Sequence, residues 1–135
     1  MNMNKLKGLL IMIMGSIFGG CIKADGIHTM NADAFEKAIQ APDVQLIDVR
    51  TANEFAAGKI GNAANIDVQQ PDFLRRVQAK FSTEKPVFVY CRSGMRSLNA
   101  ARKLQKAGFT VNNLKGGILE WEQAGKPIAS SNTKI

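Results

Sequence analysis

The sequence predicts an α/β fold, with a central, mostly parallel sheet of about five short strands and helices on both faces. Short apolar runs alternate along the chain with segments in which apolar residues recur at helical spacing. Such alternation favours right-handed crossovers between parallel strands. The chain has 135 residues, of which 45% are hydrophobic and 21% are charged. This length and composition fit one globular domain and exclude a disordered or fibrous chain.

Four short apolar runs are expected to form buried strands. The expected strands are residues 44–49, 64–66, 87–90 and 111–114. The first and third runs are rich in β-branched and aromatic residues, as central strands are. No repeat or low-complexity linker interrupts the pattern. We therefore expect one domain over residues 27–129, preceded by a tether at 21–26 and followed by a C-terminal tail at 130–135.

The segments around these strands predict helices. Helices are expected at residues 31–40, 71–81, 94–107 and 117–124. The first has Asn31 or Asp33 available as its cap, and the second opens with Pro71 in its first turn. The third stops at Gly108. In the last, Trp121 shares a face with other apolar residues, so we expect it to lie in the core.

Composition excludes several classes of protein. Two cysteines and one histidine are too few for a disulfide scaffold or a four-ligand zinc site. No apolar run reaches about 20 residues, which excludes a polytopic membrane protein. The net charge is +7, but no arginine-rich stripe with interleaved aromatic residues accompanies it. We therefore expect no nucleic-acid partner.

The N-terminal segment differs from the rest of the chain. Lys5 and Lys7 give a basic start without an acidic residue, and residues 9–18 form an almost unbroken apolar run. This run has the length of a signal-peptide core and is too short to span a bilayer. We therefore expect residues 1–20 to be a secretory signal peptide that is cleaved before Cys21.

Cys21 follows two small residues, Gly19 and Gly20, and this context resembles the lipobox of bacterial lipoproteins. Phe18 stands where that family usually has leucine. The resemblance implies that Cys21 is acylated and becomes the new N-terminus. It also implies an extracytoplasmic, membrane-anchored lipoprotein on the periplasmic or cell-surface side. A plain secretory signal with a chance cysteine is the alternative.

The turn after the expected strand 87–90 carries the strongest chemical signal. In parallel sheets, ligands bind outside the carboxyl ends of the strands, and here the strand leads into Cys-Arg-Ser-Gly-Met-Arg-Ser at residues 91–97. The amides and dipole of the following helix favour negative charge on the Cys91 sulfur, and Arg92 and Arg96 add positive charge. Gly94 allows several N–H groups to converge on one anion. A buried structural cysteine followed by solvated arginines is the alternative.

Residues 91–97 resemble the active-site loop of the rhodanese (sulfurtransferase) family. Asp48-Val49-Arg50 resembles the turn of that family's first signature, and Gly116-Gly117 before Trp121 resembles its closing segment. The resemblance runs over nearly the whole chain after Cys21. Lys59 departs from it, because the family commonly has histidine there.

The resemblance implies a sulfurtransferase that carries sulfur as a persulfide on Cys91. The donor would be a small anion such as thiosulfate, and the acceptor would be cyanide or a thiol. The amides of the loop would cradle the persulfide, and its two arginines would attract anionic donors. These substrate-binding residues are Arg92, Ser93, Gly94, Met95 and Arg96. No metal or organic cofactor is implied, and we expect a monomer.

Two other functions are weighed against this one. A rhodanese-like domain also serves as a non-enzymatic sulfur-relay or protein-binding module, here at the cell envelope with a protein as sulfur acceptor. Phosphatases related in fold carry five residues between cysteine and arginine, whereas four separate Cys91 from Arg96. The shorter loop argues against phosphatase activity.

Three further residues are expected to support the site. Asp48 either orients the Cys91 loop or closes a local turn network, and Arg50 is expected to be structural. Ser97 is expected to cap the helix rather than bond the sulfur. His28 stands alone near the start of the domain, so a Ser-His-Asp mechanism has little support.

Overall fold

The computed structural model describes residues 21–22 and 26–130. The expected signal peptide therefore lies outside the described residues, together with residues 23–25 of the expected tether and 131–135 of the expected tail. Within the described part of the chain, no helix is long and apolar enough to cross a lipid bilayer.

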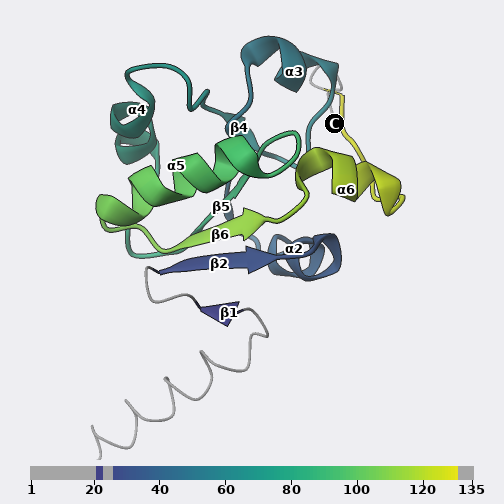
Figure 1. The fold of residues 1–135 in the computed structure, drawn as a ribbon, viewed down its shortest axis with the longest axis horizontal. Coiled ribbons are helices and arrows are strands. Elements are labelled where there is room, and N and C mark those ends of the chain that lie inside the picture. The colour runs from purple at the N-terminus through teal and green to yellow at the C-terminus, as the bar shows by residue number, and fades with distance from the viewer. Residues whose placement is uncertain (1–20, 23–25, 131–135) are drawn as a thin grey trace, which may run out of the picture.

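One twisted sheet forms the centre of the domain (Figure 1). Its strands are β1 (Cys21–Ile22), β2 (Ile27–Met30), β3 (Gln45–Asp48), β4 (Ala64–Asn65), β5 (Val87–Tyr90) and β6 (Val111–Leu114). Their order across the sheet is β1-β2-β6-β5-β3-β4. Strands β2 to β6 pair in parallel, and the short β1 pairs antiparallel with β2. The predicted mostly parallel α/β fold is confirmed.

Five described helices cover the sheet on both faces (Figure 1). They are α2 (Ala32–Ala38), α3 (Ala52–Ala57), α4 (Phe73–Lys80), α5 (Met95–Lys106) and α6 (Gly117–Gln123). Helices α4 and α5 contribute to one apolar cluster, and α2 and α6 contribute to the other. The two clusters lie on opposite faces of the sheet.

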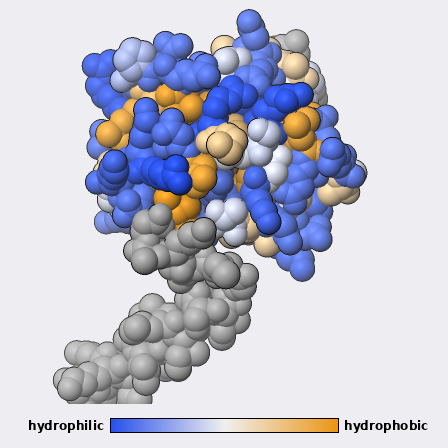
Figure 2. All heavy atoms as spheres, viewed as in Figure 1, coloured by the Kyte–Doolittle hydropathy of each residue, from blue (hydrophilic) through white to orange (hydrophobic). Residues whose placement is uncertain are grey.

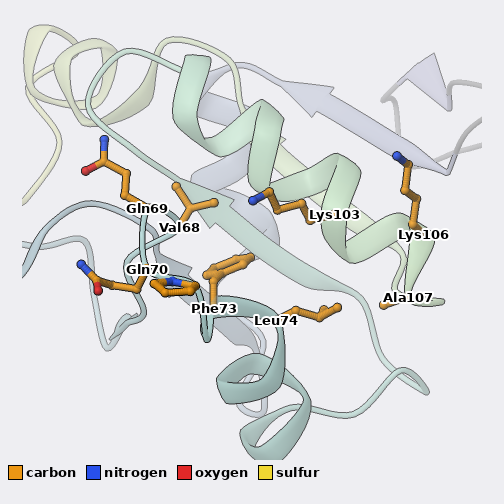
Figure 3. Close-up of a pocket in the computed structure, with 9 residues that line it drawn as sticks. Val68, Gln69, Gln70, Phe73, Leu74, Lys103, Lys106 and Ala107 are labelled. Atoms are coloured by element: carbon orange, nitrogen blue, oxygen red, sulfur yellow. The ribbon is translucent and has the colours of Figure 1, made fainter.

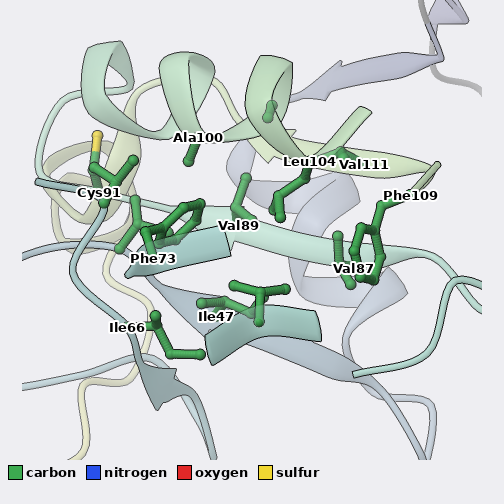
Figure 4. Packing of buried hydrophobic residues seen from close by; sticks show 14 of the residues in the cluster. Ile47, Ile66, Phe73, Val87, Val89, Cys91, Ala100, Leu104, Phe109 and Val111 are labelled. Atoms are coloured by element: carbon green, nitrogen blue, oxygen red, sulfur yellow. The ribbon is translucent and has the colours of Figure 1, made fainter. Parts of the chain in front are cut away.

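Strand β5 lies between β6 and β3 and is buried on both faces. Val87 and Val89 pack with residues of α4 and α5, whereas Phe88 and Tyr90 pack with residues of α2 and α6. Figure 4 shows Val89 beside Leu104 and Val87 beside Phe109. Burying a side chain of this size stabilises the fold by about 1.5–3 kcal/mol. This double burial explains why β5 is an unbroken apolar run.

Three described elements were not predicted from the sequence. The short strand β1 lies where a tether was expected. Strand β2 contains the polar pair His28-Thr29 and pairs in parallel with only one neighbour, β6. Helix α3 has no buried residue, so it lacks the apolar stripe that marks a surface helix. The sequence nevertheless contains a signal for the start of α3, because Thr51 and Glu54 form a capping box.

The predicted elements differ from the observed ones mainly at their ends. Asn31, rather than Asp33, caps α2, accepting a hydrogen bond from the Ala34 amide at 2.9 Å. Pro71 lies two residues before α4 rather than in its first turn. Trp121 is 2% exposed, as expected for a core residue, and its indole donates to the Pro127 carbonyl at 2.8 Å.

Candidate active site

Cys91 immediately follows β5, at the carboxyl end of the sheet. It is only 1% exposed and belongs to the same apolar cluster as Val89 and Ala100. In Figure 4 its sulfur points away from the other labelled side chains of that cluster. The Gly94 amide donates a hydrogen bond to the Cys91 Sγ at 3.1 Å. The sulfur is therefore enclosed by its own loop and has a backbone donor aimed at it.

Gly94 gives the loop its sharp turn and stands at the N-cap of α5. Its φ is +106°, a region that side chains rarely adopt. A Cβ on Gly94 would also overlap the carbonyl oxygen of Lys115, at the end of β6. No side chain among the described residues caps this end of α5. The first-turn amides are thus available to an anion at the sulfur.

The first turn of α6 holds the loop from the other side. The Ile118 amide donates to the Cys91 carbonyl at 2.9 Å, and the Leu119 amide donates to the Arg92 carbonyl at 3.1 Å. All described peptide bonds are trans, so the N–H that follows each carbonyl points the opposite way. The amides of Arg92 and Ser93 therefore point away from α6.

Gly117 makes the close approach of α6 possible. Its φ is +64°, and a Cβ there would overlap the Arg92 carbonyl. Both features require glycine, because a backbone atom cannot rotate out of the way as a side chain can. The Gly-Gly pair of the sequence therefore shapes the loop from outside it.

The Arg96 side chain is held by an ion pair with Glu54 of α3. Arg96 Nη1 and Nη2 donate to Glu54 Oε1 and Oε2 at 2.7 and 2.8 Å, a bidentate arrangement. The hydrogen bond to Arg96 lowers the pKa of Glu54 to about 2. The same hydrogen bond raises the pKa of Arg96. Both side chains are 27% exposed, so solvent screens this pair only partly.

The remaining loop side chains divide into exposed and buried ones. Arg92 and Ser93 are exposed, and Met95 is 76% exposed, so Met95 lies at the mouth of the site and not in the core. Ser97 is fully buried, and its hydroxyl donates to the Gly94 carbonyl at 3.2 Å. Since Gly94 occupies the N-cap, the expectation that Ser97 caps the helix is wrong.

Asp48 and Arg50 form a buried ion pair at the turn after β3. Asp48 Oδ1 accepts from the Arg50 amide at 2.9 Å, and Arg50 Nη2 donates to Asp48 Oδ2 at 2.6 Å. Arg50 Nη2 also donates to the Gly58 carbonyl at 2.6 Å. These contacts correspond to the local turn network, one of the two roles weighed for Asp48.

Tyr90 connects this turn network to the cysteine loop. The Arg50 guanidinium lies 5.7 Å from the centre of the Tyr90 ring, and Tyr90 directly precedes Cys91. The Tyr90 hydroxyl accepts a hydrogen bond from the Ile60 amide at 3.0 Å. Burial, together with the neighbouring Asp48 carboxylate, raises the pKa of Tyr90. Asp48 and Arg50 thus contact the residue before the cysteine.

The sequence did not predict the roles that three residues have in the site. These residues are Tyr90, Glu54 and Gly117. Glu54 carried a usable signal, because Thr-x-x-Glu is a helix-start pattern. Its partner Arg96 is 42 residues away, and no periodicity connects them.

A surface groove lies between the segment that leads into α4 and helix α5 (Figure 3). It has a volume of about 540 Å³ and is lined by residues of the segment 68–74 and of the C-terminal half of α5. Lys103 and Lys106 stand along one side of it. No residue of the cysteine loop lines this groove.

Comparisons with known proteins agree with this geometry. Residues 31–124 match the family described as Rhodanese-like domain. The uncharacterized protein YqhL of Bacillus subtilis is 46% identical over 78 residues, which span 57% of this chain and 60% of YqhL. The putative sulfurtransferase YtwF of the same organism is 35% identical over 102 residues, spanning 75% of this chain and 96% of YtwF.

The fold comparison gives the same result. The crystal structure of a rhodanese-related protein from Thermoplasma volcanium is 29% identical and superposes with a TM-score of 0.67. The match covers 76% of this chain and 98% of that one. Because the family match spans most of the chain, this protein belongs to the rhodanese-like family and is a transferase of the sulfurtransferase type.

Proposed function

We propose that the protein transfers sulfane sulfur from a donor such as thiosulfate to cyanide or a thiol through a persulfide on Cys91. The Cys91 thiolate attacks the outer sulfur of thiosulfate, the sulfur–sulfur bond of the donor breaks, and sulfite leaves with the bonding electron pair. The persulfide then gives its outer sulfur to the acceptor, and the Cys91 thiolate is regenerated.

The hydrogen bond from the Gly94 amide to the Cys91 Sγ carries this proposal. It supports a sulfur that bears negative charge, since an amide donor stabilises a thiolate more than a thiol. The N-terminus of the 12-residue helix α5 adds its dipole at the same point. Cys91 is 1% exposed, so bulk water has little access to its sulfur.

The experiment that tests this proposal is a thiosulfate–cyanide assay on the full chain, with thiocyanate as the measured product. We expect turnover by the wild-type protein and none by Cys91→Ser, which replaces the sulfur with a much weaker nucleophile. Cys21→Ser is the matched control, because it makes the same substitution at the other cysteine and keeps the loop. Thiocyanate formation by Cys91→Ser at the wild-type rate would contradict the proposal.

The alternative is a sulfur-relay module that exchanges sulfur with a partner protein and turns over little free thiosulfate. The exposure of Met95 beside the loop favours it, because methionine is an adaptable apolar side chain that is common at protein-binding surfaces. In that case the wild-type protein would form little thiocyanate from thiosulfate, yet Cys91 would accept sulfur from a protein persulfide.

For localisation, the proposal is an extracytoplasmic lipoprotein anchored through Cys21. The basic start, the apolar run and the small residues before Cys21 support it. A lipoprotein carries several acyl chains and is therefore held firmly at a membrane. Cys21→Ala is expected to abolish the incorporation of labelled palmitate and to release the protein from the membrane fraction. Unchanged labelling would contradict the proposal.

A further inference from the structure

We infer that Glu54 determines which sulfur donors the site prefers, by offsetting the charge of Arg96 so that the loop favours monoanionic donors over the thiosulfate dianion. This inference rests on the proposed sulfur transfer and deepens it. The donor class it names comprises sulfane compounds with a single negative charge at neutral pH, such as organic thiosulfonates and persulfides.

The geometry shows that Arg96 is committed to Glu54. Both carboxylate oxygens of Glu54 accept from the guanidinium, at 2.7 and 2.8 Å. Glu54 is fixed in turn by Thr51, whose amide and hydroxyl donate to Glu54 Oε1 at 3.2 and 3.1 Å. A planar guanidinium held at two donors has fewer left for the oxygens of a substrate. Arg96 is therefore a poor clamp for a sulfonate group while the pair is intact.

The electrostatics point the same way. Arg96 lies in the first turn of α5, and the charge of Cys91 is one of the influences on its pKa. Glu54 stays ionised over the whole physiological range because its pKa is about 2. The pair therefore brings no net charge to the loop. Arg92 is the other arginine of the loop, and it is exposed, so solvent and salt screen its charge.

The chemistry of two matched donors isolates the effect of charge. Thiosulfate is a dianion, and methanethiosulfonate is a monoanion with a methyl group in place of one oxygen. The Cys91 thiolate attacks the outer sulfur of either donor and breaks the same kind of sulfur–sulfur bond. Sulfite leaves in the first case and methanesulfinate in the second, and the persulfide that remains is identical. The total charge is conserved in both reactions.

Glu54→Gln is the variant that removes the charge and preserves the fold. Glutamine keeps an oxygen for Thr51, and it serves at this helix position as glutamate does. Glu36→Gln is the matched control. Glu36 pairs with Lys126 at 2.7 Å, and it lies on α2, which packs on the face of the sheet opposite α5. The two variants change the net charge equally, so only the position of the lost charge differs.

The experiment measures kcat/KM for both donors with cyanide as acceptor, for the wild-type protein and the two variants. Electrostatic attraction scales with donor charge, so Glu54→Gln is expected to raise kcat/KM about tenfold for thiosulfate and about threefold for methanethiosulfonate. The gain is expected mainly in KM, and it should shrink at high salt. Glu36→Gln is expected to behave as the wild-type protein with both donors.

The outcomes separate the inference from the proposed function. Equal changes for both donors, or a loss with both, would overturn the inference, because a purely structural role of Glu54 does not depend on donor charge. Such a result would leave sulfur transfer by the wild-type protein intact. No sulfur transfer by the wild-type protein from either donor would instead overturn the proposed function.

Discussion

Gly117→Ala tests how the structure holds the cysteine loop. The left-handed conformation of Gly117 costs alanine about 1–2 kcal/mol. The new Cβ would also overlap the Arg92 carbonyl, so α6 must move away from the loop. That movement breaks the hydrogen bonds from the Ile118 and Leu119 amides, at about 1 kcal/mol each. The expected loss of stability is about 3–4 kcal/mol, a large part of the roughly 5–15 kcal/mol of a typical domain.

Gly125→Ala provides the control for backbone conformation. Gly125 has a similar φ of +73°, but a Cβ there meets no atom within 4 Å. Only the conformational cost of about 1–2 kcal/mol applies to this variant. Urea unfolding, followed by the fluorescence of the single tryptophan, Trp121, measures both variants. Equal shifts of the two unfolding midpoints would refute the claim that Gly117 is required by the close approach of α6.

Three other perturbations test the surroundings of the loop. Arg50→Met leaves the Asp48 carboxylate buried without its ion-pair partner. We expect the free energy of unfolding, measured with urea, to fall by about 3–5 kcal/mol. A fall of less than about 1 kcal/mol would contradict a buried ion pair. Tyr90→Phe removes the acceptor of the Ile60 amide, so the free energy of unfolding should fall by about 1–3 kcal/mol in the same assay. An unchanged free energy of unfolding would contradict this hydrogen bond. The pairing of Glu54 lowers its pKa from 4.5 to about 2, so its stabilising effect is complete above pH 4.5 and is lost as the pH falls toward 2. Stability curves against pH should show this acid loss in the wild-type protein and a smaller one in Glu54→Gln; identical curves would contradict it.

The strands that carry the site could be predicted because they are buried on both faces. The run from Val87 to Tyr90 is apolar at every position, and all four residues contact one of the two clusters. The position of Cys91 followed from this run, since the cysteine comes directly after the strand and before a helix. Local sequence was therefore enough to place the sulfur at the carboxyl end of the sheet.

The rest of the site depends on contacts between distant segments. Glu54 meets Arg96 across 42 residues, and nothing in the local pattern of either segment announces the pair. Helix α3, which supplies Glu54, was missed because it buries no residue and so shows no apolar periodicity. Strand β2 was missed because its central residues, His28 and Thr29, are polar. Three of the four residues of β2 are only partly buried, which relaxes the demand for apolar residues that revealed β5.

The ion pair of Asp48 and Arg50 was foreseen only as one of two alternatives. Sequence placed both residues at the turn after a strand but could not say which groups they would meet. The structure directs the Asp48 carboxylate to the backbone and side chain of Arg50. Two residues separated only by Val49 thus pair with each other, and Arg50 also reaches the Gly58 carbonyl and the Tyr90 ring.

Intact-mass measurement of the full chain after brief exposure to thiosulfate shows whether Cys91 carries sulfur. The wild-type protein is expected to gain the mass of one sulfur atom and to lose it when cyanide is added. Cys91→Ser, which retains Cys21, is predicted to show no gain. An equal gain in the two proteins, or no gain in the wild-type protein from thiosulfate, methanethiosulfonate or a small persulfide, would contradict this role of Cys91.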